Sequence, residues 1–181
     1  LVKCAPTFIP QVLLSMRRLK DRLEDAGLGD LWASEAGHIV RLGKARALFF
    51  SAEPGSHVVG ATADVLLEVD EAQDVDKEKF ARDFRPMGAA ANATTVLYGT
   101  AWDDQTLLEE MKQVNLELER RDGVRRHFRF DWQEVGKYNA DYGRYVEEER
   151  TRLGQDNPLF QTQYCLNPVR GGGGFLSPGQ R

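Results

Sequence analysis

Little in this sequence indicates a disulfide framework, a zinc site or a membrane span. It contains two cysteines and three histidines in 181 residues. Cys4 and Cys165 lie far apart in apolar surroundings, so we expect two free, buried thiols, as in proteins of a reducing compartment. His38, His57 and His127 stand alone, without the close spacing of zinc ligands. No apolar run approaches the roughly 20 residues that cross a bilayer, so no membrane contact is expected.

Two further absences limit the chemistry. No serine lies in a G-x-S-x-G pattern, and neither cysteine has a recognisable base beside it, so covalent nucleophilic catalysis has little support. The formal net charge is −4, which lacks the basic excess of a dedicated nucleic-acid binder. Contact with nucleic acid would need a local patch, and basic residues cluster at 17–22 and 124–129. The first cluster is most simply the solvated face of a helix.

What is present is typical of one globular domain with a sizeable core. Hydrophobic residues make up 41% of the chain and charged residues 29%, a balance that disordered chains do not have. The chain opens directly on a strand-like stretch at residues 1–5, which suggests an interior piece of a longer protein. Its end, residues 169–181, is rich in glycine and is interpreted as a linker or tail.

The hydrophobic pattern predicts helices and strands in alternation. Apolar residues recur at spacings of three and four between Ile9 and Leu23, and Thr106 with Glu109 forms a capping box. Helices are therefore predicted at about residues 9–23, 77–82, 107–121, 139–154 and 157–165. Strands are predicted at 1–5, 38–42, 45–52, 64–69, 94–100 and 124–132. This order predicts an α/β fold, with a mainly parallel central sheet flanked by helices and an added β-hairpin around Gly43-Lys44.

Two adjacent acids, Asp70 and Glu71, directly follow the strand predicted at 64–69. Adjacent carboxylates repel each other, and a divalent metal would offset that cost. In nucleotide hydrolases, an acid at the carboxyl end of a parallel strand holds Mg²⁺, and its neighbour orients or deprotonates the attacking water. The alternative is that Asp70 caps the following turn and Glu71 is solvated. On these residues alone both interpretations stay open.

Two further pairs of residues are candidate site residues. Gly99 and Thr100 end a predicted strand, and the Thr100 hydroxyl would lie beside the acidic pair if the two strands are neighbours. It could then sense a γ-phosphate or bond the attacking water, and the alternative is an ordinary turn. Arg41 and Arg46 flank the hairpin turn and are candidates for an arginine finger acting in trans, although most surface arginines have no such role.

Four stretches together resemble the ATPase domain of phage terminase large subunits, the motors that package DNA into capsids. They are "APT" (5–7), "SAEPGSHVVGATADVLLEVDEA", "VLYGTAW" and "FQTQYCLNP", and the resemblance runs from Val2 to about residue 175. It implies a P-loop ATPase core of the additional-strand, catalytic-glutamate class. In that core Asp70 would be the Walker B metal-binding acid and Glu71 the catalytic glutamate. Gly99 and Thr100 would form the coupling motif, and residues 5–7 would match the helicase-like motif after the second strand.

One departure from that family stands out, because no G-x-x-x-x-G-K-[ST] occurs in the chain. In the family this P-loop lies on the first strand and helix, upstream of Leu1, and it supplies the backbone cradle for the phosphates. The nuclease domain that should follow the linker is absent as well. We therefore expect residues 1–168 to be a partial ATPase domain that lacks its first strand and P-loop. Alone, it should bind no nucleotide tightly and hydrolyse almost none.

The resemblance also implies the setting of the parent protein. Its cofactors would be ATP and Mg²⁺, and its partners double-stranded DNA, the small terminase subunit and the portal protein. It would form a homo-oligomeric ring in the cytoplasm of a bacterial host. The alternatives are a helicase-like P-loop motor, and a non-catalytic α/β module that acts by protein or DNA contact. A P-loop upstream and an acid-rich nuclease domain downstream would decide for the terminase.

Overall fold

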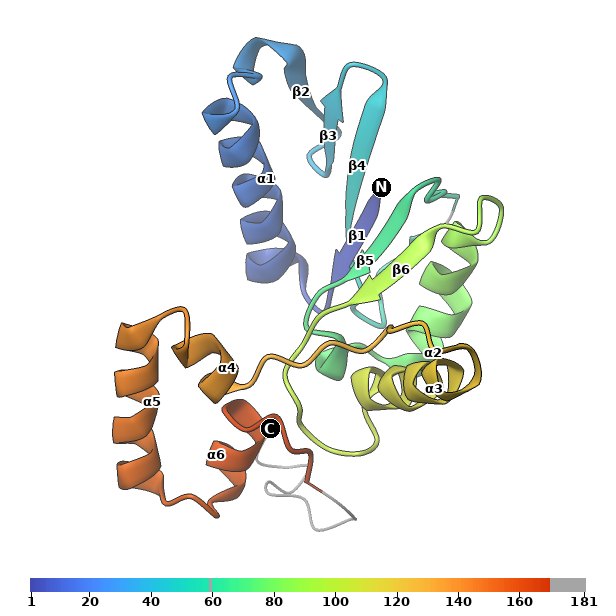
Figure 1. Ribbon diagram of the computed structural model, residues 1–181. Helices are drawn as coiled ribbons and strands as arrows, with labels where there is room; N and C mark the ends of the chain where they lie inside the picture. The colour runs from blue at the N-terminus through green and yellow to red at the C-terminus, as the bar shows by residue number, and fades with distance from the viewer. Residues whose placement is uncertain (59, 170–181) are drawn as a thin grey trace. The chain divides into compact units, whose positions relative to one another are not determined.

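The computed structural model describes residues 1–58 and 60–169, which form two compact units that divide between Gly99 and Thr100 (Figure 1). Residues 170–181, which hold nearly all of the predicted linker, lie outside the described residues. In the part of the chain that is described, every helix is too short or too polar to cross a bilayer.

The first unit is built on a sheet of six strands in the order β2-β3-β4-β1-β5-β6. Strands β4, β1, β5 and β6 run parallel to one another, whereas β3 pairs antiparallel with both β2 and β4. The strands are β1 (Val2–Ala5), β2 (Trp32–Glu35), β3 (Ile39–Leu42), β4 (Ala45–Ser51), β5 (Leu66–Val69) and β6 (Thr94–Leu97). The predicted α/β fold with a mainly parallel sheet is confirmed.

The predicted hairpin is confirmed as β3 and β4, which are joined by Gly43 and Lys44. Gly43 has a φ of 57°, the left-handed conformation that a two-residue hairpin turn requires and that glycine adopts without strain. Strand β2 was not predicted, and it extends the hairpin to three antiparallel strands by pairing with β3. Its four residues, "WASE", are too few to show a clear alternation.

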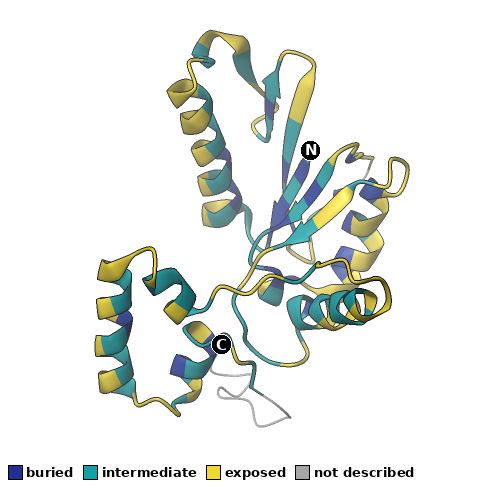
Figure 2. Cartoon of the chain, in the orientation of Figure 1, coloured by how far each residue is buried: buried dark blue, intermediate teal, exposed yellow. Residues whose placement is uncertain are grey.

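Each face of the sheet is covered by a different helical segment. On one face α1 (Leu13–Asp25) packs over β1, β3 and β4. The buried core of that face consists of Ala5, Val12, Met16, Val40 and Phe49. Side chains alternate along a strand, so Val2, Cys4, Leu67 and Val69 point to the opposite face, and all four are fully buried (Figure 2).

The second helical segment comprises α2 (Lys77–Lys79) and the helical turns Phe80–Phe84 and Arg85–Gly88, the last of which packs against β5. It contributes buried Phe80, Phe84 and Met87 to the core. Cys4 lies in this apolar interior, and burial raises the pKa of its thiol to about 12. The thiol is therefore neutral and free, as predicted.

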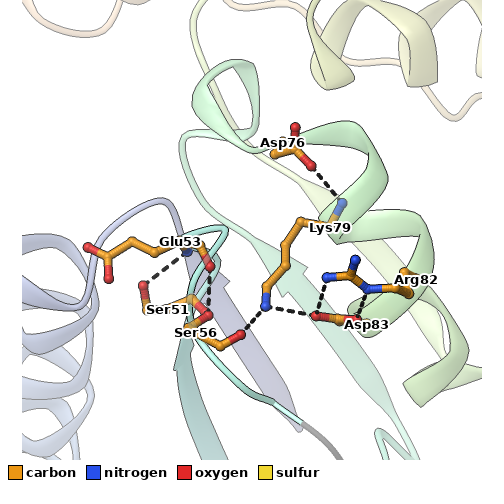
Figure 3. Close-up of polar contacts among 7 residues, drawn as sticks. All are labelled: Ser51, Glu53, Ser56, Asp76, Lys79, Arg82 and Asp83. Carbon is orange, nitrogen blue, oxygen red and sulfur yellow. Dashed lines mark hydrogen bonds and ion pairs between the residues drawn. The ribbon is translucent and has the colours of Figure 1, made fainter.

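A buried lysine ties this helical segment to the loop after β4 (Figure 3). Only 2% of Lys79 is exposed, and its Nζ lies 2.7 Å from Asp83 Oδ2 and also donates to the carbonyl oxygen of Ser56. The Ser56 hydroxyl in turn donates to the carbonyl oxygens of Ser51 and Glu53, both at 2.8 Å. Because a buried ammonium needs such partners, Lys79 holds the loop in place through its bonds.

Asp83 makes the stability of the first unit depend on pH. Hydrogen bonds from Arg82 and Lys79 hold the pKa of Asp83 well below its usual range. A carboxyl whose pKa is lowered by folding stabilises the protein above its unfolded pKa, and that contribution is lost as pH falls through the folded pKa. Asp83→Asn should therefore be less stable than the parent chain near neutral pH, but lose less stability below about pH 4.

Urea unfolding at neutral and acid pH checks this, with Asp21→Asn, which replaces an exposed acid of α1, as the matched control. Equal acid sensitivity of the Asp83→Asn and Asp21→Asn chains would show that the Lys79–Asp83 pair contributes nothing.

The second unit is helical. Its helices are α3 (Leu107–Asp122), α4 (Trp132–Gly136), α5 (Ala140–Leu153) and α6 (Pro158–Gln163). The predicted capping box is present in part, because the Thr106 hydroxyl accepts the Glu109 N–H at 3.2 Å. Asp131, Asn139 and Asn157 cap the other three helices in the same way.

The strand predicted at 124–132 is wrong. Residues 123–131 have no regular structure, and Trp132 is the first residue of α4. Alternation of basic and apolar residues indicates an extended backbone, but a strand also needs a partner strand for its N–H groups. Here the Glu119 carboxylate accepts the N–H groups of Arg126 and His127 instead. Those bonds lower the pKa of Glu119.

Candidate functional site

The carboxyl ends of the parallel strands bring the predicted acids to one edge of the sheet. Val69 of β5 pairs with Leu97 of β6, so Asp70 and Gly99 emerge at the same edge. The two exits are bonded together, because Tyr98 N–H donates to the Val69 carbonyl and Ala72 N–H to the Tyr98 carbonyl, both at 2.8 Å. The two strands are therefore neighbours, as the role considered for Thr100 requires. Thr100 is the first residue of the second unit.

The backbone turns sharply at Glu71. This residue has φ 49° and ψ 47°, a left-handed conformation that few residues other than glycine adopt. Its Oε2 accepts a hydrogen bond of 2.6 Å from Gln73 Nε2, so the carboxylate is held by a neighbour as well as being partly exposed. Strained backbone conformations are found mainly at functional sites, so the conformation of Glu71 supports a functional role for this strand end.

Asp70 lies in a small polar cluster that the sequence did not predict. Lys3 Nζ, from the adjacent strand β1, is 3.4 Å from Asp70 Oδ2 and 3.9 Å from Glu68 Oε2. The Tyr98 hydroxyl donates to Glu68 Oε1 at 3.3 Å, and Lys3 Nζ lies 5.8 Å from the centre of the Tyr98 ring. Burial, together with the Glu68 carboxylate, raises the pKa of Tyr98. The sequence did contain a signal for this cluster, because Lys3 and Glu68 are the single charged residues of β1 and β5.

The acidic pair fits a magnesium ion that is bound mainly through water and substrate. Among the described residues, no three His, Cys, Asp or Glu side chains gather into a metal-binding cluster. Mg²⁺ in nucleotide hydrolases needs no such cage, because one or two carboxylates, waters and phosphate oxygens complete its octahedron. Asp70, partly exposed and followed by a second acid, could supply one of those carboxylates.

The "APT" stretch lies at the carboxyl end of β1, at the same edge of the sheet. Ala5 ends the strand and is buried, and the Thr7 N–H and hydroxyl both bond Gln11 Oε1, at 2.9 and 2.8 Å. These bonds fix the turn Phe8–Val12, which leads into α1.

The two hairpin arginines face each other and share one acid. Arg41 and Arg46 are paired across β3 and β4, and Glu35 accepts from Arg41 Nε at 2.6 Å and lies 3.6 Å from Arg46 Nε. Arg41 also donates to the Gly43 carbonyl. The Arg46 side chain is the more exposed of the two, 61% against 38%.

The second unit holds a pocket of about 290 Å³ that contains none of the predicted site residues. It is lined by Arg129, Asp131, Trp132, Gln133, Arg150, Gln155, Phe160, Gln161, Cys165 and Asn167. Trp132 and Phe160 meet edge to face at 6.3 Å, and Arg129 donates to Asn167 Oδ1 at 3.2 Å.

No protein-family model and no curated protein matches this sequence. Solved structures do match its fold. A mutant of the large terminase ATPase domain of Thermus phage P74-26 superposes with a TM-score of 0.66 at 16% identity, over 93% of this chain and 76% of that one.

Two structures of the large terminase of another thermophilic bacteriophage, one of them in complex with ADP, give TM-scores of 0.61 and 0.60 at 13% and 14% identity. The matches cover 90% and 91% of this chain but only 39% of each of those two chains, so this chain spans about two fifths of their length. The fold is therefore that of large terminase ATPase domains.

Proposed function

We propose that this chain is part of the ATPase domain of a terminase large subunit, the ATP-driven motor that packages viral DNA. The observation that carries the proposal is the placement of Asp70 and Glu71 at the carboxyl end of β5, next to β6, in a fold shared with large terminase ATPase domains. Ligands of open α/β sheets gather at this edge.

The two acids would have different tasks in this proposal. Asp70 would hold Mg²⁺, and the ion would supply positive charge that neutralises the phosphate oxygens during transfer. Glu71 would orient the attacking water and accept its proton. Its bond from Gln73 and its fixed backbone restrict where the carboxylate can point, and such restriction is what a general base needs.

The phosphate cradle would come from a longer polypeptide. Among the described strands, β6 is an edge of the sheet and has β5 as its one neighbour, so one row of its backbone N–H and C=O groups is available for pairing. An upstream strand added parallel to β6 would end at the same edge as Asp70. A P-loop following that strand would then lie at this edge on the β6 side, and Asp70 at the end of β5 would face it across the metal.

Gly99 and Thr100 suit a role in coupling hydrolysis to DNA movement. They follow the bonded exit of β6 and stand at the boundary between the two units. A hydroxyl there can bond differently with ATP and with ADP, because only ATP has a γ-phosphate, and α3 begins a few residues later. Such a difference is what a two-state element requires.

The parent protein would act as a homo-oligomeric ring on double-stranded DNA, with the small terminase subunit and the portal protein, in the cytoplasm of a bacterial host. Arg46 suits a trans-acting arginine finger better than Arg41, because it is more exposed and more weakly paired with Glu35.

The test compares this chain with a longer polypeptide that includes the upstream P-loop and the downstream domain. The longer polypeptide should hydrolyse ATP with Mg²⁺ and translocate double-stranded DNA, whereas this chain should bind ATP weakly and hydrolyse almost none. Calorimetry and ATPase assays measure both. ATP hydrolysis with strand separation but no duplex translocation would favour a helicase-like motor, and no hydrolysis by the longer polypeptide would favour a non-catalytic module.

A further inference from the structure

Lys3 lies between two carboxylates on one face of the central sheet. The strand register places it opposite Glu68, and its Nζ is 3.4 Å from Asp70 Oδ2 and 3.9 Å from Glu68 Oε2. The three side chains are 17%, 19% and 33% exposed for Lys3, Glu68 and Asp70. Charges so far withdrawn from water interact more strongly than charges on an open surface.

An ammonium and a divalent cation compete for the same carboxylate. While Asp70 is paired with Lys3, its oxygens are poorer ligands, and the positive charge of Lys3 repels a second cation nearby. Glu68 offers the ammonium another acceptor within reach. Its two oxygens already have separate contacts, since Oε2 faces Lys3 and Oε1 accepts the Tyr98 hydroxyl.

We propose that Lys3 is a positioning residue that neutralises Asp70 until a divalent cation binds there, and that the ammonium then moves to Glu68. This inference rests on the metal-binding role proposed for Asp70. It explains why a lysine and a glutamate face each other in otherwise apolar strands, because the Lys3 ammonium can then pair with either Asp70 or Glu68. The exchange would set the affinity of Asp70 for the metal.

The test is an NMR titration of this chain with Mn²⁺, in which paramagnetic broadening of the backbone amide signals of Asp70 and Ala72 reports binding. Lys3→Met should tighten Mn²⁺ binding about three- to tenfold, because it removes both the competing partner and the repulsion. Lys3→Arg keeps the charge and should bind within about twofold of the parent chain. Lys44→Met loses the same charge at an exposed turn and should change nothing. Unchanged or weaker binding in Lys3→Met would overturn the proposal.

A double-mutant cycle tests the movement to Glu68. With Lys3 present, Glu68→Gln should weaken Mn²⁺ binding about threefold, since the ammonium loses its alternative acceptor. In the Lys3→Met background the same change should have a clearly smaller effect. An equal effect in both backgrounds would show that Glu68 acts on the metal only through its charge, and the movement would be wrong. Thermal unfolding of each variant confirms that its fold is retained.

Two failures are distinguishable. If no chain shows broadening around Asp70, then Asp70 binds no divalent cation in the absence of nucleotide, and this inference is wrong. The proposed metal site is then judged separately, by Mg²⁺-dependent nucleotide binding of Asp70→Asn in the longer polypeptide. If Mn²⁺ binds near Asp70 but the Lys3 variants behave like the parent chain, only the role of Lys3 is wrong. The packaging function is then still judged by ATP hydrolysis and DNA translocation in the longer polypeptide.

Discussion

Glu71→Gln in the longer, P-loop-containing polypeptide is expected to lower kcat for ATP hydrolysis by about 10²–10⁴-fold, the usual contribution of a general base. The affinity for ATP should hardly change, because the amide keeps the size of the side chain and the role proposed for Glu71 is to act on the attacking water and not on the nucleotide. Single-turnover hydrolysis and equilibrium nucleotide binding, measured on the same preparation, separate the two effects.

Two companion variants make the Glu71 experiment decisive. Asp70→Asn should weaken Mg²⁺-dependent nucleotide binding, which Glu71→Gln leaves intact. Glu78→Gln removes an equivalent charge from the exposed face of α2 and should hydrolyse ATP at the parent rate. Near-normal turnover by Glu71→Gln would mean that another group activates the water, and the catalytic role would have to be reassigned.

Phe84→Ala is expected to reduce the free energy of unfolding of the first unit by about 3–5 kcal/mol, the typical cost of truncating a buried phenylalanine. The Phe84 side chain is fully buried, and the helical segment that carries it packs against β5. The loss combines the transfer of apolar surface to water with the cavity that remains. Because β5 positions Asp70, metal binding at Asp70 should weaken as the population of folded chains falls.

Amide hydrogen exchange in β5, combined with urea unfolding, measures this change in the first unit. Phe128→Ala serves as the control, since Phe128 is 57% exposed and its removal should change stability by no more than about 0.5 kcal/mol. A loss below about 1 kcal/mol in Phe84→Ala would show that the helical segment is not a fixed layer of the core.

Local patterns in the sequence were sufficient for most of the first unit. The hairpin followed from two alternating stretches around Gly43-Lys44, and β5 and β6 from short apolar runs that end in polar residues. Both runs were predicted longer than the strands are. For example, the predicted strand at 64–69 included Asp64 and Val65, but β5 begins only at Leu66. Strand ends depend on pairing, which a single segment does not encode.

The same limit explains the failures. Residues 124–132 alternate as a strand does, yet Glu119 of α3 accepts the N–H groups of Arg126 and His127 and no strand forms. "WASE" shows almost no pattern, yet it becomes β2 because β3 offers it an edge. In both places a partner outside the segment decided the conformation, since an extended chain finds its hydrogen-bond partners in other segments.

The candidate site divides along the same line. The sequence by itself determined the acids Asp70 and Glu71 and their place after a strand, because an apolar run that ends in two carboxylates is a purely local signal. Only the tertiary structure decided that Lys3 and Glu68 belong to the same cluster. Those two residues meet because β1 lies beside β5 in the sheet, and the order of strands is set by long-range pairing and packing, which spacing along the chain does not record.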